Sequence, residues 1–161
     1  MAAVKQPSPA VLARTAIHRK GPSAPLRYLL GQGLIIGRVL DFGCGRGADV
    51  AHLVGLGPGL GYTHVIGWDP YWRPERPTGL FDTVLCSYVV NVLSEREQAR
   101  MLRDLRSFLK PTGTGYVAAR NDLEQSGAIV QRDVLAIPGG TPILGSRRLR
   151  FRLWSIGPHK A

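Results

Sequence analysis

The stretch VLDFGCGRGADV, residues 39–50, constrains the fold more than any other part of the chain. Glycine occupies positions 43, 45 and 47, directly after a short apolar run and directly before a helical pattern. A glycine turn between a strand and a helix lets the backbone approach a ligand closely and points helix N–H groups at it. The stretch therefore predicts a strand–turn–helix unit with a ligand bound at the turn.

Apolar runs and helical patterns alternate along the rest of the chain, which predicts an α/β fold with a mostly parallel sheet and helices on both faces, in three layers. The expected strands are Val39–Phe42, Thr63–Asp69, Phe81–Val90 and Gly113–Arg120, with an antiparallel closing pair at Ala128–Ile137 and Arg147–Ile156. The expected helices are Pro25–Ile35, Arg46–Gly57 and residues 95–110, the last opened by a Ser94/Glu97 capping box. Ligands of such folds bind at the carboxyl ends of the strands. One crevice should therefore be bordered by the glycine turn, Asp69, Ser87–Asn91 and Arg120–Asp122.

Two aspartates indicate what the crevice binds. Asp69 ends the second expected strand, where a carboxylate suits the hydroxyls of a ribose, so the cofactor should carry adenosine. The spacing Gly43, Gly45, Ala48 also meets the G-x-G-x-x-A variant of the dinucleotide pattern. Asp41 decides between a dinucleotide and S-adenosylmethionine as the cofactor. A carboxylate beside the turn would repel the pyrophosphate of a dinucleotide but would suit a cationic ammonium or sulfonium. The pair favours S-adenosylmethionine.

With these residues in place, VLDFGCGRGADV resembles the cofactor motif of class I S-adenosylmethionine-dependent methyltransferases, which have a Rossmann-like fold. GWDP, FDTVLCSYVVNVL and LRSFLKPTGTGYVAA follow in the order of that family, so the resemblance runs from about Arg38 to Ala119. It implies that the turn and Asp41 hold the methionine part, that Asp69 holds the ribose, and that Ser87 and Tyr88 form the floor near the transferred methyl group. The cofactor-binding residues implied are Asp41, Gly43, Cys44, Gly45, Gly47, Asp69, Pro70, Ser87 and Tyr88.

A closer resemblance covers more of the chain. TAIHRKGPSAPLRYLL, GWDPYWRP, YVVNVLSEREQ and AARND are similar to bacterial and phage methyltransferases linked to DNA phosphorothioation. GCGRGAD also resembles the GCGKGGD form of RNA cap guanine methyltransferases, but nothing else in the chain follows that family.

The chain departs from the usual class I pattern in two places. Only eleven residues separate Asp69 from Phe81, too few for a helix and a further strand, and little room remains for a long helix after Asp122. We therefore expect a trimmed fold whose third strand and last helix are reduced or absent. Tyr71, Trp72 or Leu80 would then cover the adenine.

Candidates for catalysis follow the third expected strand. Tyr88 and then Asn91 are favoured, with packing against the cofactor or capping of the next helix as the alternative for both. His18 would act as a base if the N-terminal segment folds over the crevice. The segment SYVVN has no Pro-Pro, which disfavours methylation of exocyclic amines of DNA, and neither Cys44 nor Cys86 follows a proline as cytosine C5 chemistry needs. No metal spacing is present.

Basic residues are concentrated in the flanks of the chain. The formal net charge is +10, yet residues 41–133 are close to neutral, whereas residues 1–40 and 134–161 carry Lys and Arg but no acid. Such flanks suit phosphates. A solvated surface is the alternative, and three guanidiniums on one face of the last strand would fit either a phosphate backbone or a protected sheet edge. The candidate nucleic-acid contacts are Arg14, Arg19, Lys20, Arg148, Arg150 and Arg152.

These patterns predict an irregular segment at residues 1–13 and one methyltransferase domain at residues 14–161 in the cytoplasm, with no membrane contact. The favoured function is methyl transfer to a nucleic-acid or nucleotide acceptor. A small metabolite as the acceptor is the first alternative. A cofactor-binding module that is active only with a partner subunit is the second.

Overall fold

One six-stranded sheet organises the protein, in a computed structural model that describes residues 16–123 and 131–158. Its strands run in the order β2-β1-β3-β4-β6-β5, the first four parallel and the last two antiparallel to their neighbours. Their bounds are β1 Gly37–Phe42, β2 Tyr62–Trp68, β3 Phe81–Ser87, β4 Leu109–Arg120, β5 Thr141–Ser146 and β6 Phe151–Ile156. The expected α/β sheet with a closing antiparallel pair is confirmed.

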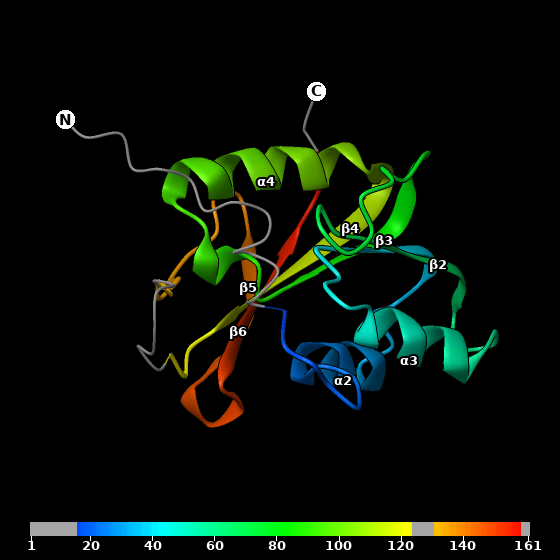
Figure 1. The fold of residues 1–161 in the computed structure, drawn as a ribbon, viewed down its shortest axis with the longest axis horizontal. Helices are drawn as coiled ribbons and strands as arrows, with labels where there is room; N and C mark the ends of the chain where they lie inside the picture. Colours follow the sequence, from blue (N-terminus) through cyan, green and yellow to red (C-terminus); the bar gives the residue numbers. More distant parts are fainter. Residues whose placement is uncertain (1–15, 124–130, 159–161) are drawn as a thin grey trace.

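Helices cover both faces of this sheet (Figure 1). Helix α4, Glu95–Ser107, lies on one face, while α2, Ala24–Gly31, and α3, Ala48–Leu56, lie on the other. Short 3-10 turns, η1 at Val90–Val92 and η2 at Arg147–Leu149, follow β3 and β5. Among the described residues, no helix is long and apolar enough to cross a membrane.

The period of two along each parallel strand gives the sheet its two cores. In β1, Leu40 packs toward α4 and Val39 packs toward α2 and α3, and both side chains are fully buried. The α4 face buries Met101, Leu102 and Leu105 of the helix. Because both faces are covered, central strands such as β1 are apolar without the alternation typical of a half-exposed sheet.

The trimmed version of the fold is confirmed at the β2 edge of the sheet. Residues 70–80 connect β2 to β3 without a helix or a further strand, so β2 is an outer strand. The described part of the segment after Asp122, residues 131–140, also contains no helix.

Three sequence expectations are corrected near the C-terminal end. The described part of the expected strand Ala128–Ile137 is irregular, its residues 128–130 lie outside the described part of the chain, and the partner of β6 is Thr141–Ser146. The last strand begins at Phe151 rather than Arg147. Arg148 therefore lies in η2 and Arg150 in the turn after it, so these two do not share a strand face with Arg152. The expected irregular segment 1–13 and Arg14 lie outside the described residues.

Helix α4 begins at the capping box that the sequence predicts. The Glu97 N–H donates to Ser94 Oγ at 3.3 Å, and the Ser94 N–H donates to Glu97 Oε2 at 2.7 Å. We expect Ser94→Ala to lower the free energy of unfolding by about 1 kcal/mol, because the N-cap acceptor of the helix is lost. Urea denaturation of both proteins checks this, with the exposed position Arg103→Ala as control; equal midpoints for Ser94→Ala and wild type would contradict it.

Candidate functional site

The glycine turn after β1 has the backbone shape that only glycine adopts easily. Gly43, Gly45 and Gly47 all lie in the left-handed region, with φ of 79°, 53° and 81°. The Gly43 and Cys44 N–H groups both donate to the Trp68 carbonyl, at 2.8 and 3.0 Å, which ties the turn to the end of β2. A Cβ at Gly43 would lie 2.5 Å from a methyl group of Val89. The turn therefore lies tightly between the ends of β2 and β3, and Gly47 opens α3.

Asp69 joins this turn to the loop that follows β2. Its Oδ2 accepts from the Gly45 N–H at 3.1 Å, and its Oδ1 accepts from the Tyr71 and Trp72 N–H groups at 2.9 Å each. An isolated bridge between Asp69 and Arg73 closes the loop. The carboxylate is thus fixed in place by three backbone donors while it still borders a cavity.

Asp41 is the buried charge of the site. Only 4% of the residue is exposed at the end of β1. Burial and then the nearby Asp49 carboxylate raise the pKa of Asp41 to about 8, against the opposing effect of Arg19 and Arg73. Asp41 is therefore largely protonated at neutral pH, and a cation placed beside it would favour its charged form.

The described segment before α2, residues 16–23, is bound to this region through Asp49 of α3. The Ser23 N–H and Oγ–H donate to the two Asp49 oxygens at 2.7 and 2.6 Å, and the Arg19 guanidinium lies 3.5 Å from the same carboxylate. The Arg19 Nε is buried with no hydrogen-bond partner among the described residues. This contact could not be anticipated from the sequence, because Ser23 and Asp49 are far apart in the chain.

A cavity of about 490 Å³, here called the glycine-turn cavity, opens between the turn and the ends of β2 and β3. Of the residues implied by the family resemblance, the following line it: Gly43, Cys44, Gly45, Asp69, Pro70, Ser87 and Tyr88. Tyr71 and Trp72 also line it, whereas the exposed Leu80 does not, which favours the two aromatic residues over Leu80 as cover for the adenine. The Arg46 guanidinium stacks over the Trp72 ring at 4.7 Å.

Other wall residues were not anticipated from the sequence. Helix α4 contributes Glu97, Arg100 and Met101 to the glycine-turn cavity. Trp68 contributes an indole whose Nε1 is buried without a hydrogen-bond partner among the described residues. A buried donor without a partner is unusual, and it suits a bound group that accepts a hydrogen bond.

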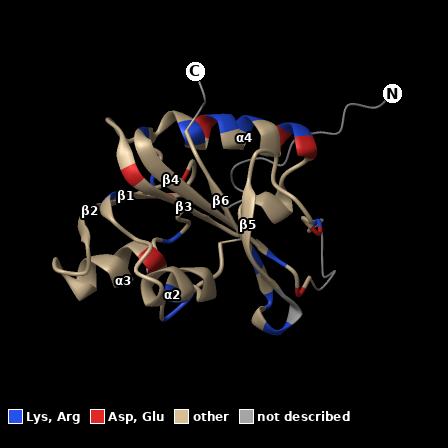
Figure 2. Cartoon of the chain, turned by 180° about the vertical axis from the view of Figure 1, so that it is seen from behind, with Lys and Arg blue, Asp and Glu red and all other residues tan. Residues whose placement is uncertain are grey.

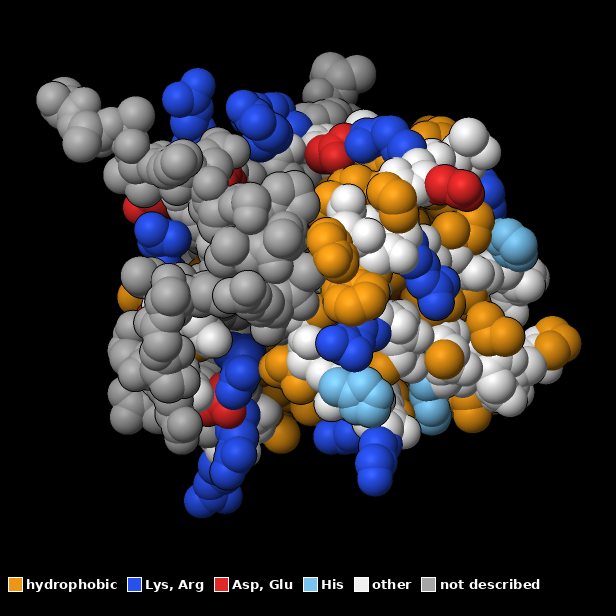
Figure 3. Space-filling view, in the orientation of Figure 1, with side chains coloured by type: hydrophobic (Ala, Val, Ile, Leu, Met, Phe, Trp, Pro, Cys, Tyr) orange, Lys and Arg blue, Asp and Glu red, His pale blue; other side chains and the backbone are white. Residues whose placement is uncertain are grey.

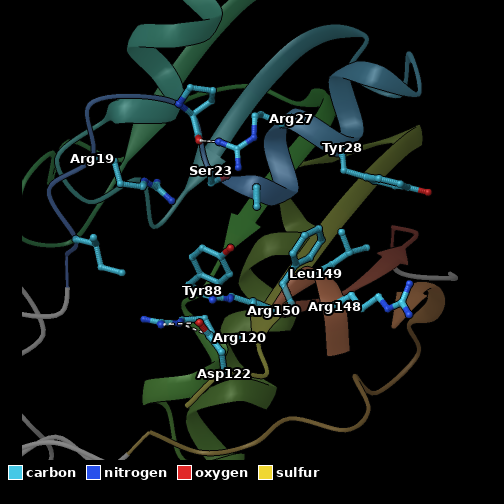
Figure 4. A pocket seen from close by; sticks show the side chains of 14 residues that line it. Arg19, Ser23, Arg27, Tyr28, Tyr88, Arg120, Asp122, Arg148, Leu149 and Arg150 are labelled. Atoms are coloured by element: carbon cyan, nitrogen blue, oxygen red, sulfur yellow. Dashed lines mark hydrogen bonds and ion pairs between the residues drawn. The ribbon is translucent and has the colours of Figure 1, made fainter. Parts of the chain in front are cut away.

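A second cavity, of about 690 Å³, adjoins the first on the α2 side of the sheet (Figure 4). We call it the arginine cavity because five arginines line it. Ile17, Arg19 and Tyr88 line both cavities, so the two meet at these side chains. The arginines of the lining are Arg19, Arg27, Arg120, Arg148 and Arg150.

Tyr88 stands at the junction in a strained conformation. Its φ is 67°, and its N–H donates to the Ala118 carbonyl at 2.8 Å, which holds the strained backbone against β4. Burial raises the pKa of the Tyr88 phenol, with Arg19 and Arg120 opposing. The hydroxyl therefore stays protonated at neutral pH and acts as a hydrogen-bond donor or acceptor rather than as a phenolate base.

The other two catalytic candidates do not line either cavity. Asn91 is fully buried, and its side chain bonds the backbone of Arg120 and Arg132. His18 is exposed, although its neighbours Ile17 and Arg19 do fold over the crevice. These positions favour a structural role for Asn91 over the predicted catalytic one, and they do not place His18 as a base.

The two cysteines lie near the site but are not activated. Cys44 is buried, its thiol donates to the Gly45 carbonyl at 3.6 Å, and burial raises its pKa to about 12. Burial also raises the pKa of Cys86, whose sulfur lies 3.8 Å from the Met101 sulfur. Both thiols stay protonated, which excludes them as thiolate nucleophiles at neutral pH. The described residues contain no cluster of metal-ligating side chains.

A protein-family model described as a methyltransferase domain matches residues 10–154 of this chain. The chain therefore belongs to the methyltransferase-domain family. More particularly, it is an S-adenosylmethionine-dependent methyltransferase, with the Rossmann-like fold of that class.

Solved structures agree on the fold. The chain is 18% identical to DhpI, solved as an SAH complex, with a TM-score of 0.60 over 84% of each chain. It is 15% identical to the glycopeptide N-methyltransferase MtfA complexed with sinefungin, with a TM-score of 0.58 over 86% of this chain and 94% of the other. A structure from echinomycin biosynthesis is 18% identical, with a TM-score of 0.57 over 84% and 80%. A search of curated sequences finds no significant match.

Proposed function

We propose that the glycine-turn cavity holds S-adenosylmethionine and that the acceptor approaches from the arginine cavity. The single observation that carries this proposal is the meeting of the two cavities at Tyr88, at the carboxyl end of β3. Ligands of open parallel sheets bind at this end of the strands. A volume of about 490 Å³ is within the range of small-molecule and cofactor sites.

The residues of the glycine-turn cavity fit this cofactor group by group. Asp41 does not itself line the cavity; its buried carboxylate, one residue before the lining residue Phe42, is the group that we assign to the cationic ammonium. The Arg19 Nε, which lacks a partner among the described residues, offers a donor to the carboxylate of the methionine part. Asp69, fixed by three backbone donors, keeps lone pairs for the ribose hydroxyls. Tyr71 and Trp72 supply aromatic surface for the adenine.

The chain contributes positioning to the transfer itself. When bound, S-adenosylmethionine would supply a methyl group that the lone pair of an acceptor attacks in line, with the neutral thioether of S-adenosylhomocysteine as the leaving group. Tyr88 lies where the two cavities meet, Ser87 precedes it in the wall of the glycine-turn cavity, and the Tyr88 hydroxyl stays protonated. Alignment of the two reactants by these walls supplies much of the rate of such a displacement.

The acceptor that we propose is a nucleotide or a nucleic acid. The basic flanks of the sequence support it, as does the resemblance to methyltransferases linked to DNA phosphorothioation. Arg19, Arg148 and Arg150, three of the candidate contacts, line the arginine cavity. In Figure 3, Lys and Arg side chains gather at the lower left of the face, the region in which Figure 1 places η2.

A small-molecule acceptor is the second candidate. The neighbour MtfA is named as a glycopeptide N-methyltransferase, and another neighbour, MmcR, as a mitomycin 7-O-methyltransferase. Incubation with methyl-labelled S-adenosylmethionine and, in parallel, RNA, DNA, mononucleotides and a metabolite extract separates the candidates. Label in a nucleotide or polynucleotide fraction is the expected result; label confined to uncharged metabolites would contradict the nucleotide proposal.

The cofactor assignment makes a prediction for Asp69. We expect Asp69→Ala to weaken binding of S-adenosylhomocysteine by about tenfold to a hundredfold, because two charge-assisted hydrogen bonds to the ribose are lost and the loop loses its anchor. Isothermal titration calorimetry measures the affinity. The matched control is Glu75→Ala, an exposed acid on the same loop that lines neither cavity. An unchanged affinity in Asp69→Ala would overturn the ribose assignment.

A further inference from the structure

The arginine cavity has a strong excess of positive charge among its lining side chains. Its five arginines face a single acid, Asp122, which Arg120 engages through Nε at 2.9 Å. That hydrogen bond lowers the pKa of Asp122, and the charge of Arg150, which lines the same cavity, lowers it further. In Figure 4, Arg19 and Arg120 approach Tyr88 from opposite sides, and both act on the Tyr88 phenol electrostatically.

Backbone strain marks the same cavity. Among the described residues, Tyr88 and Arg150 are the two non-glycine residues with positive φ, at 67° and 57°, and both line it. Arg150 is the single residue between η2 and β6, and its carbonyl accepts from the Asn121 N–H at 3.2 Å. A glycine would adopt this conformation at lower cost, and strain of this kind clusters at ligand sites.

Apolar side chains complete the wall of the cavity. Ile17 and Leu149 are 51% and 42% exposed there, and Tyr28 adds ring surface, while Phe151 lines the cavity as a buried ring. Exposed apolar groups beside guanidiniums fit a ligand that has an anionic end and a flat, apolar body. Guanidinium forks match phosphate geometry by bidentate hydrogen bonds, and several of them together suit a dianion better than a single carboxylate.

We propose that the arginine cavity binds a nucleotide through its phosphate, with Arg150 as the main contact and the base against the apolar wall. This inference rests on the proposed function, because the nucleotide bound here would be the methyl acceptor that meets the cofactor at Tyr88. The same phosphate chemistry is offered by a free mononucleotide and by the 5′ end of a nucleic-acid strand. The test has an arm for each source.

The test compares GMP with guanosine by calorimetry on the full chain, with S-adenosylhomocysteine present in excess so that the glycine-turn cavity is filled. We expect GMP to bind at least about tenfold tighter than guanosine, since charge-assisted contacts to the phosphate are the difference between them. In the second arm, a 5′-phosphorylated oligonucleotide is compared with its 5′-hydroxyl form. A larger ratio in the first arm assigns the free nucleotide, and a larger ratio in the second assigns the strand end.

Arg150→Gly is the decisive variant, because it should move stability and binding in opposite directions. Glycine accepts φ of 57° without strain, so the melting temperature should stay equal or rise, while the GMP-over-guanosine ratio should fall by about tenfold. Arg103→Ala is the charge-matched control, on the exposed face of α4 across the sheet. Figure 2 shows that the basic residues of α4 alternate with acidic ones there.

Two results would overturn the phosphate site. One is equal affinity of the wild type for GMP and guanosine. The other is an equal fall of the GMP-over-guanosine ratio in Arg150→Gly and Arg103→Ala, which would mean that the overall positive charge, and not a phosphate site, attracts GMP. Failure of the proposed function has a different signature: S-adenosylhomocysteine would not bind, or no methyl group would be transferred, while the preference for GMP persisted when the cofactor analogue was omitted.

Discussion

Asp41→Asn is expected to make the cofactor-free protein more stable at pH 8 and, in the same variant, to weaken cofactor binding. The folded-state pKa of Asp41 is about 8 and its ordinary value is 3.8, because burial and Asp49 disfavour the charge. The native state therefore binds a proton more tightly than the unfolded state. The stability from this proton is fully present below about pH 4 and is lost as the pH rises through 8.

Asparagine carries no charge at any pH, so its advantage should grow between pH 4 and pH 8. We expect Asp41→Asn to raise the free energy of unfolding by about 2–4 kcal/mol at pH 8 and to have little effect at pH 4. Urea denaturation at both pH values measures this difference. Glu75→Gln, which removes an exposed carboxylate, should show no such growth. An Asp41→Asn effect that is equal at both pH values would refute the buried-carboxylate argument.

Cofactor affinity should respond to pH in the opposite way. Because a bound ammonium group favours the Asp41 carboxylate, binding below pH 8 should release a proton. The affinity of the wild type should therefore rise by up to about tenfold per pH unit between pH 6 and pH 8. Calorimetry in buffers of different ionisation enthalpy counts the released proton directly. Asp41→Asn should bind weakly and release none; proton release equal to that of the wild type would assign the linkage to another group.

The glycine turn could be predicted from the sequence because its signals are local. Three glycines in five residues fit a backbone with three left-handed conformations, and the apolar run before them fits a strand buried on both faces. Asp69 was predictable for the same reason, since a strand end and a carboxylate lie next to each other in the chain. The absence of the strand that usually follows β2 in class I methyltransferases could be predicted from length alone, because the eleven residues between Asp69 and Phe81 cannot supply a helix and a strand.

The outer strand β5 could not be predicted, because its sequence does not read as a strand. Strand β5 contains Pro142 and Gly145, which usually indicate a loop, and an outer strand tolerates them since one side has no partner. The alternation of arginine and apolar residues before Phe151 suggested one long strand. The left-handed backbone conformation of Arg150 interrupts that strand, and an arginine in this conformation leaves no local signal in the sequence.

The candidate catalytic residues show most clearly the limit of prediction from the sequence, because polar residues near a strand end serve structure or chemistry equally well. Asn91 follows β3 just as a catalytic residue would, and its partners come from residues 29 and 41 positions away. The arginine cavity likewise combines α2, β4 and the η2 turn, which only the folded sheet brings together.

Asn91→Ala should destabilise the protein by about 2–4 kcal/mol, because it leaves buried backbone groups without partners. Its amide donates to the Arg120 carbonyl at 3.0 Å and to the Arg132 carbonyl at 2.9 Å, and its Oδ1 accepts from the Arg120 N–H at 2.8 Å. Asn91 is fully buried, so water cannot replace these bonds without opening the core. Thermal and urea unfolding measure the loss, and Gln98→Ala, which breaks two bonds of a less buried amide, should cost less.

Kinetics separates the structural role of Asn91 from a catalytic one. Arg120 and Asp122 line the arginine cavity, so a loosened end of β4 should raise KM for the acceptor by several-fold and leave kcat of the folded fraction nearly unchanged. A catalytic Asn91 would give the reverse, a lower kcat at nearly unchanged stability and KM. Because the side chain contacts backbone on both of its polar atoms, we expect the first pattern: Asn91 shapes the arginine cavity by holding β4 and the segment at Arg132 to the turn that follows β3.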